Sequence, residues 1–186
     1  MIELPLYLTT AQGLEPLLAD ELRALGITDV QLHNGGIGLR TDLAHAYQIC
    51  LWSRTASRVL SPLAEVSAVT AEALYEQALT MAWEEHISPT ATLAVDFHGS
   101  NAELRHSQYG AQRVKDAIVD RLRQRTGARP SVDTRQPDIR INAHLRGDKL
   151  TLALDLSGDS LHRRGYRVAP VAAPLKENLA AALLLK

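Results

Sequence analysis

The sequence predicts an α+β protein made of two consecutive units, each of which mixes helices with strands. Three observations support this fold class. Apolar patterns of helical and strand period alternate along the chain, turn residues separate them, and a composition of 46% hydrophobic and 22% charged residues is ordinary for a globular protein. The predicted boundaries are 1–66 for the first unit, 67–156 for the second, 157–173 for a linker and 174–186 for a further helix.

The first unit is predicted to have the ferredoxin-like order strand, helix, strand, strand, helix, strand. Asn34-Gly35-Gly36 is a hairpin signal between two short strands, Gly26 is a natural helix stop, and Asp42 is a helix N-cap. The expected elements are 4–9, 13–25, 30–33, 37–40, 42–51 and 58–66.

The only cysteine, Cys50, lies in the apolar pattern of the second helix with Ala46, Tyr47 and Leu51. One cysteine excludes an intramolecular disulfide and fits a reducing cytoplasm. A small buried hydrophobe is the favoured interpretation of Cys50, and a catalytic thiol is the alternative.

The second unit is predicted from two helices and three strands. Thr70 begins a helix over whose end Trp83 and Ile87 close, and Gly127 ends the long second helix. Gly99-Ser100-Asn101 is expected as a loop. The expected elements are 70–81, 92–97, 107–125, 139–145 and 150–156, with a hairpin turn at 146–149.

Residues 157–173 contain the glycines and prolines typical of a linker. Pro174 then opens an apolar helix that continues to Lys186 without a cap or stop signal. We therefore expect the sequence to be the N-terminal piece of a longer protein.

Charge is sorted along the chain. Residues 1–104 carry four Lys or Arg against thirteen Asp or Glu, whereas residues 105–167 carry fourteen against seven. A basic segment of this kind favours a polyanionic partner, because phosphates bound by Lys and Arg release counterions. Clustered but solvated surface charge is the alternative.

The long helix carries the first candidate binding residues. Gln108 and Tyr109 lie at its N-terminus, where free N–H groups and the helix dipole attract anions, and Lys115 follows one to two turns later. Arg113 lies on the opposite, mixed-charge face. In the alternative interpretation, Lys115 simply extends its methylenes over the core and keeps its ammonium in water.

The second group of candidates is Arg163, Arg164, Tyr166 and Arg167, in the predicted linker. Arginine forks beside an aromatic ring are typical of contacts to single-stranded or looped RNA. Ion pairs from these arginines to nearby acids such as Asp155 and Asp159 are the alternative.

Other kinds of site find no support in the sequence. The scattered histidines and single cysteine show no metal-ligand spacing, and no apolar run approaches the length of a membrane span. Gly35, Gly36 and Gly38 belong to a hairpin and do not form a nucleotide-binding loop. We expect these residues to be non-catalytic on their own, with no catalytic, cofactor or metal site.

Several long, ordered motifs resemble one bacterial family, the large-subunit (23S) ribosomal RNA guanine-N2-methyltransferases of the RlmL/RlmKL type, once labelled N6-adenine DNA methylases. The resemblance extends along the whole chain. Its motifs are Thr10-Ala11-Gln12-Gly13-Leu14-Glu15, Leu51-Trp52-Ser53-Arg54-Thr55-Ala56-Ser57-Arg58, Ser107-Gln108-Tyr109-Gly110-Ala111, Lys115-Asp116-Ala117-Ile118-Val119-Asp120, Pro137-Asp138-Ile139-Arg140, Asp155-Leu156-Ser157-Gly158-Asp159, His162-Arg163-Arg164-Gly165-Tyr166-Arg167 and Pro174-Leu175-Lys176-Glu177.

This resemblance implies an N-terminal ferredoxin-like subdomain over 1–66 and a THUMP RNA-binding domain over 67–156. It places the start of a methyltransferase domain, which uses S-adenosylmethionine, at 174. The implied partners are ribosomal RNA and that catalytic domain in cis. The resemblance does not fix which THUMP side chains contact RNA.

The leading hypothesis is that this chain docks structured ribosomal RNA for the catalytic domain. The alternative is an intramolecular scaffold that packs on the catalytic domain without dominant RNA contacts. A third hypothesis, catalysis by these residues alone, is opposed by the missing cofactor loop.

Overall fold

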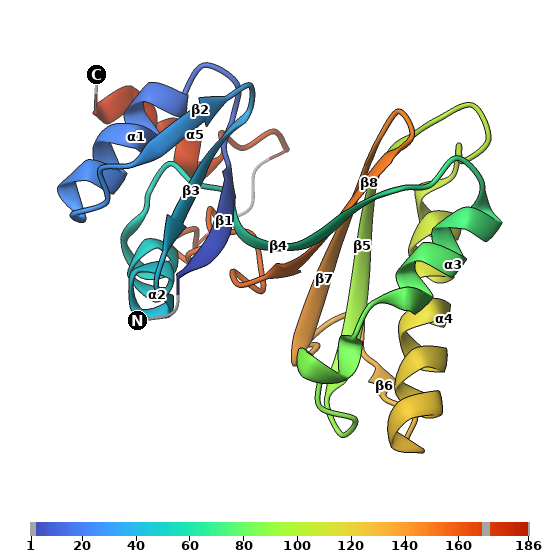
Figure 1. Ribbon diagram of the computed structural model, residues 1–186. Coiled ribbons are helices and arrows are strands. Elements are labelled where there is room, and N and C mark those ends of the chain that lie inside the picture. The colour runs from blue at the N-terminus through green and yellow to red at the C-terminus, as the bar shows by residue number, and fades with distance from the viewer. Residues whose placement is uncertain (1–2, 169–171, 186) are drawn as a thin grey trace. The chain divides into compact units, whose positions relative to one another are not determined.

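The computed structural model describes residues 3–168 and 172–185, and the chain divides into two compact units (Figure 1). The first unit consists of residues 1–61 and 156–186, and the second of residues 62–155. Each unit combines helices with strands, which confirms the predicted α+β class.

The first unit has the predicted ferredoxin-like order. Strand β1 is antiparallel to both β3 and β4, and the strands lie in the order β2-β3-β1-β4. Asp42 caps α2 by accepting a hydrogen bond from the His45 amide, as predicted. The elements are β1 (Leu4–Thr9), α1 (Glu15–Ala24), β2 (Val30–His33), β3 (Gly36–Thr41), α2 (Leu43–Trp52), β4 (Arg58–Ser67) and α5 (Glu177–Leu184).

The prediction for the buried face of α2 was partly wrong. Ala46 is buried as expected, but its companion is Ile49, and Tyr47 and Leu51 are 59% and 64% exposed. Ile49 and Ala46 share one helix face and fill the core of the first unit. Cys50 is half-buried, and its thiol donates to the carbonyl of Leu156.

Residues 156–168 do not behave as a free linker, because they join the first unit. The amide of Leu156 donates to the carbonyl of Val59, and Leu161 is buried in the same core as β1 and α1. The side-chain amide of Asn178 in α5 donates to Ser57 Oγ at 2.9 Å. Part of the predicted linker, 169–171, lies outside the described residues.

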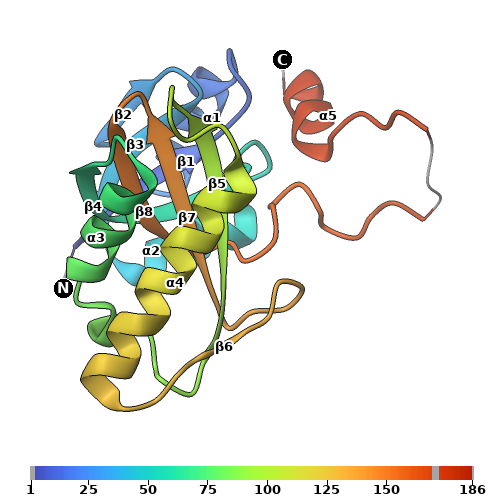
Figure 2. The same ribbon diagram turned by 90° about the vertical axis from the view of Figure 1, so that its right-hand side faces the viewer.

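The second unit is a sheet with α3 and α4 on the same face (Figures 1 and 2). Its strand order is β4-β8-β7-β5-β6, in which β5 is parallel to β7 and β7 is antiparallel to β8. Trp83 and Ile87, which were predicted to close over the end of α3, are buried in the core of this unit. The elements are the end of β4, α3 (Ala71–Thr80), a 3-10 turn (Trp83–Glu85), β5 (Thr92–Ser100), α4 (Ser107–Thr126), β6 (Ser131–Val132), β7 (Ile139–Arg146) and β8 (Lys149–Asp155).

Two features of this sheet differ from the prediction. The short strand β6 was missed, and Gly99-Ser100, expected as the start of a loop, continues β5 because it pairs with Leu145 and Arg146 of β7. Gly99 has φ +88°, and a Cβ there would lie 1.9 Å from the Leu145 carbonyl oxygen. A glycine is therefore required for the strand to continue at this point.

Candidate nucleic-acid interface

The predicted binding residues fall into two groups that belong to different units. Gln108, Tyr109, Arg113 and Lys115 lie on α4 in the second unit, whereas Arg163 to Arg167 belong to the first unit. Each group is therefore described within its own unit.

Gln108 and Tyr109 are exposed in the first turn of α4, where Tyr109 is 48% accessible. His106, the residue before the helix, provides no side-chain cap, so the first-turn amides are available to an anion. A shallow hollow surrounds this helix end. It is lined by Arg105, His106, Ser107, Gln108, Tyr109 and Gln112.

Gly110 follows Tyr109 but has a packing role. An added Cβ would lie 2.8–2.9 Å from the ring of Phe97, so glycine lets α4 approach β5 closely. This contact holds the first turn of α4, with Tyr109, against the sheet.

Arg113 is committed to helix packing. Its guanidinium lies 4.6 Å from the centre of the Tyr75 ring, and its Nε is buried without a hydrogen-bond partner in the described part of the chain. The Tyr75 hydroxyl donates to the Asp120 carboxylate at 2.8 Å, and this hydrogen bond, followed by burial, raises the pKa of Tyr75. Arg113 thus joins α4 to α3.

Lys115 is half-buried and forms an ion pair with Asp116. Its side chain is 23% exposed, the position expected of a lysine that extends along the edge of the core. The structure therefore gives Lys115 a local partner, and its contact with RNA remains a prediction.

The C-terminal half of α4 is partly neutralised by Glu84. The Glu84 carboxylate accepts two hydrogen bonds from Arg121, at 2.7 and 3.0 Å, and lies 3.6 Å from Arg125. The bond from Arg121 is the main cause that lowers the pKa of Glu84 to about 2. This bidentate pair fixes α4 on the turn that follows α3.

The basic segment nevertheless retains cations without acidic partners. Within residues 3–168 and 172–185, the Lys and Arg of 105–167 that pair with an acid are Lys115, Arg121, Arg125, Arg140, Lys149 and Arg167. Those without an acidic partner in the same described ranges are Arg105, Arg113, Arg123, Arg129, Arg135, Arg146, Arg163 and Arg164.

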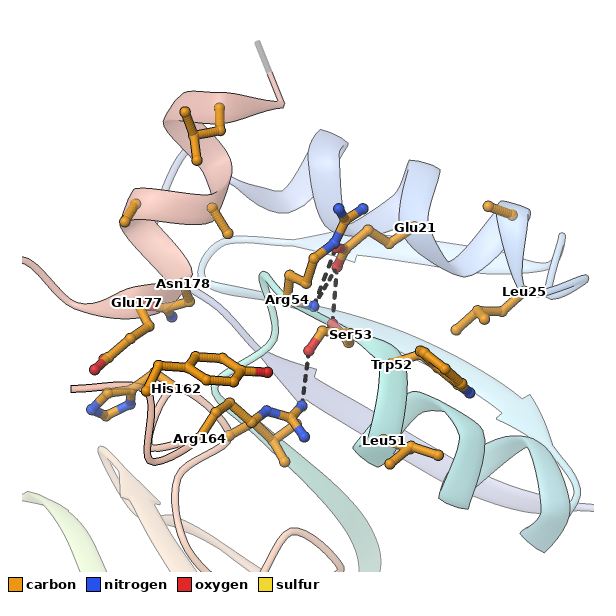
Figure 3. Close-up of a pocket in the computed structure, with 16 residues that line it drawn as sticks. Glu21, Leu25, Leu51, Trp52, Ser53, Arg54, His162, Arg164, Glu177 and Asn178 are labelled. Atoms are coloured by element: carbon orange, nitrogen blue, oxygen red, sulfur yellow. Dashed lines mark hydrogen bonds and ion pairs between the residues drawn. The ribbon is translucent and has the colours of Figure 1, made fainter. Parts of the chain in front are cut away.

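Arg164 is an anchor of the first unit (Figure 3). Its Nη2 donates to the carbonyl oxygens of Cys50 and Ser53, at 2.8 and 3.0 Å, and so satisfies the C-terminal end of α2. Arg167 Nη2 donates to the carbonyl of Leu175 and lies 3.5 Å from Glu177. Neither arginine uses the acidic partners, Asp155 and Asp159, that the alternative interpretation proposed.

Arg163 and Tyr166 differ from these neighbours because their side chains are available. Tyr166 is 77% exposed, and Arg163 makes no side-chain hydrogen bond or ion pair within the described residues. Of the second group of candidates, these two side chains can contact a ligand without breaking a structural bond.

The same region forms an open pocket of about 940 Å³ that sequence reasoning missed (Figure 3). Glu21 lies at its margin and accepts hydrogen bonds from Ser53 Oγ, Thr55 Oγ1 and Arg54 Nε, at 2.9, 2.6 and 3.1 Å. In the sequence, Glu21 has the pattern of an ordinary polar position of α1. Its partners Ser53, Arg54 and Thr55 lie in the motif Leu51-Trp52-Ser53-Arg54-Thr55-Ala56, and this motif is the sequence feature that could have located the pocket.

The pocket wall is mainly apolar. Trp52 of α2 is 64% exposed, and Leu184 of α5 is 89% exposed. His162 accompanies Arg164 on the polar side, where burial lowers the pKa of its imidazole. An exposed aromatic beside arginine side chains can accommodate either a base or an apolar protein surface.

The described residues contain no cluster of three or more His, Cys, Asp or Glu placed to hold a metal ion. Among the same residues, no helix has the length and apolar character that crossing a bilayer requires.

Two family models match the chain, one in each unit. Residues 5–60 match the RlmL ferredoxin-like domain, and residues 68–155 match the THUMP domain. The first unit therefore contains an RlmL ferredoxin-like domain, and the second contains a THUMP domain.

Comparison with individual proteins agrees with this assignment. The chain is 55% identical over 180 residues to ribosomal RNA large subunit methyltransferase K/L of Syntrophotalea carbinolica, an alignment that covers 97% of the chain and 25% of that protein. The chain thus spans about a quarter of the length of the curated relatives it matches.

Two solved structures align with the whole of this chain. A protein of Listeria monocytogenes, described as a predicted N6-adenine-specific DNA methylase, has 31% identity and a TM-score of 0.83 over 100% of this chain and 48% of its own. SMU.472, solved in complex with SAH, has 28% identity and a TM-score of 0.81 over 100% of this chain and 49% of its own.

Proposed function

We propose that these two domains bind large-subunit ribosomal RNA and position it for a methyltransferase domain of the same, longer protein. The observation that carries the proposal is the THUMP domain at 68–155, together with exposed arginines of the basic segment that have no acidic partner among the described residues, namely Arg105, Arg123, Arg129, Arg135, Arg146 and Arg163. Cations left unpaired within a fold are available to phosphates.

The chemistry of the longer protein is proposed from its relatives. Those matched in sequence are named ribosomal RNA methyltransferases, and SAH, found with SMU.472, is what S-adenosylmethionine becomes after giving up its methyl group. S-adenosylmethionine is therefore the proposed methyl donor. Guanine N2 is the proposed acceptor because the sequence motifs resemble guanine-N2-methyltransferases, and we assign neither to residues of these two domains. Cytoplasmic localisation is proposed because ribosomal RNA is the substrate.

The existing partners and the exposure of each side chain indicate which candidate residues are free to contact RNA. Arg113, Lys115, Arg164 and Arg167 already have partners, whereas Gln108, Tyr109, Arg163 and Tyr166 are exposed. We propose the latter four as direct RNA contacts, with the partnered residues acting mainly through the fold.

The proposal is tested by fluorescence anisotropy with labelled fragments of 23S ribosomal RNA at several salt concentrations. We expect log affinity to fall linearly with log salt, and Arg163→Gln to reduce the slope by about one if it holds one phosphate. Tyr109→Ala removes a stacking surface worth about 1–3 kcal/mol per base. The matched control is Arg23→Gln, which changes an exposed arginine of the acidic segment. Absence of RNA binding at low salt overturns the proposal.

One observation favours a second candidate, the intramolecular scaffold. Leu43, Tyr47 and Leu51 recur every four residues on α2 and are 47%, 59% and 64% exposed, with Trp52 beside them. An exposed apolar stripe of this kind is typical of an interaction surface. RNA footprints of the full-length protein and of these two domains distinguish the candidates, because a scaffold leaves no footprint of its own.

A further inference from the structure

The sheet of the second unit presents two histidines directly opposite each other. In the parallel pairing of β5 with β7, His98 lies opposite His144, and Ser100 lies opposite Arg146. Side chains alternate between the two faces of a strand, so these four residues share one face. Phe97 and Leu145 belong to the other face, which packs in the core beneath α3 and α4.

The side chains of this cluster are accessible to solvent. His98, Ser100, His144 and Arg146 are all exposed, and within 3–168 and 172–185 the side chains of the two histidines and Arg146 form no hydrogen bond or ion pair. Neighbouring strands are about 4.8 Å apart, so both imidazoles can reach oxygens of one phosphate group.

The charges around the histidines are compatible with an anion. Thr151 of β8 lies opposite His144, and Lys149 of β8 lies opposite Arg146 and pairs with Glu65 of β4. The nearest acid on β5, Asp96, pairs with Arg140 of β7. Strand β6 pairs only with the first residues of β5, and α4 covers the opposite face.

We propose that His98, His144 and Arg146 form a phosphate-binding site for the RNA backbone, through which RNA affinity rises as pH falls. This inference rests on the proposed function and adds a site and a pH dependence to it. In the free protein, burial, His98 and Arg146 together lower the pKa of His144, so this imidazole is neutral near pH 7. A phosphodiester between the rings stabilises their protonated forms, and RNA binding therefore takes up protons.

The test measures the dissociation constant of a fluorescein-labelled 23S ribosomal RNA hairpin between pH 5.5 and pH 7.5 at fixed ionic strength. Each proton taken up strengthens binding by at most about tenfold per pH unit. We expect binding at least about tenfold tighter at pH 5.5 than at pH 7.5, and a change of less than about threefold for the double variant His98→Gln/His144→Gln. The control His86→Gln removes an exposed histidine elsewhere in the second unit and keeps the wild-type dependence.

Histidine NMR titrations provide a second readout that does not depend on affinity. We expect RNA to raise the pKa of His144, and Arg146→Gln to reduce that rise. An unchanged pKa of His144, or an unchanged pH dependence of RNA affinity in the double variant, overturns the inference. If RNA still binds at pH 7.5, the proposed function is unaffected by that outcome. If inorganic phosphate raises the pKa of His144 and RNA does not, the site binds free anions and the inference also fails. Absence of RNA binding at every pH overturns both.

Discussion

The guanidinium of Arg113 lies over the ring of Tyr75, 4.6 Å from its centre, and joins the two helices of the second unit. Arg113→Met keeps most of the side-chain volume and removes the cation. We expect a loss of about 0.5–1 kcal/mol in the free energy of unfolding, measured by urea denaturation. A large fall in RNA affinity with no loss of stability would instead make Arg113 a ligand contact.

Tyr75→Phe distinguishes the contribution of the Tyr75 ring to stability from that of its hydroxyl. It keeps the surface beneath Arg113 but removes the hydrogen bond to the Asp120 carboxylate. Because hydrogen bonds to charged groups contribute about 1.5–3 kcal/mol, we expect a loss of that order in urea denaturation. A Tyr75→Phe variant as stable as wild type contradicts this assignment.

Gly110→Ala is expected to destabilise the second unit even though alanine favours helices. The new methyl group would lie within 2.9 Å of the Phe97 ring, and overpacking of this kind costs about 1–3 kcal/mol. Gln112→Ala, at an exposed position of the same helix, is the control and should be neutral or slightly stabilising. Thermal and urea denaturation measure both variants.

Glu84 should make the stability of the second unit sensitive to acid. Its pKa is about 2 in the folded state and 4.5 as its ordinary value, so the contribution is present in full above pH 4.5. It is lost as pH falls from 4.5 towards 2, because the unfolded chain binds the proton first. Glu84→Gln should flatten the dependence of the unfolding free energy on pH in this range. An equally steep dependence in the variant would falsify this assignment.

Arg163 and Arg164 are adjacent but should behave differently. Arg164→Ala removes the hydrogen bonds that its guanidinium donates to the carbonyl oxygens of Cys50 and Ser53, and we expect a loss of about 1–3 kcal/mol in stability. Arg163→Ala should change stability by less than about 0.5 kcal/mol while weakening RNA binding. Urea denaturation measures the stability of both variants, and fluorescence anisotropy measures their RNA affinity. Equal losses of stability in the two variants would contradict this prediction.

Much of the fold follows from local sequence signals. The cap at Asp42, the turn at Gly35 and the left-handed Gly127 all lie where the sequence predicted them, because such positions depend on a few neighbouring residues. The face that α2 buries was partly mispredicted, since Tyr47 and Ile49 are both apolar and tertiary packing chooses between them. Strand β6 has two residues and pairs with β5 far along the chain, so no local pattern indicates it.

The candidate site was less predictable than the fold. Sequence composition located the basic segment but could not separate arginines that bind the protein itself from those that face solvent. Arg164 and Arg163 illustrate this, because only the fold brings the carbonyls of α2 to one of them. The position of His98 opposite His144 depends on the register of two parallel strands, so the sequence could not predict it either.

The first unit is assembled from two stretches of chain, with 62–155 inserted between them. During synthesis, the THUMP domain is therefore complete before Leu161 emerges to fill its place in the ferredoxin-like core. Translation imposes an order in which the inserted domain can fold first and its host domain closes last. A ribosome stalled when residue 155 but not residue 161 has left the exit tunnel should display a protease-resistant THUMP domain attached to an unfinished N-terminal domain.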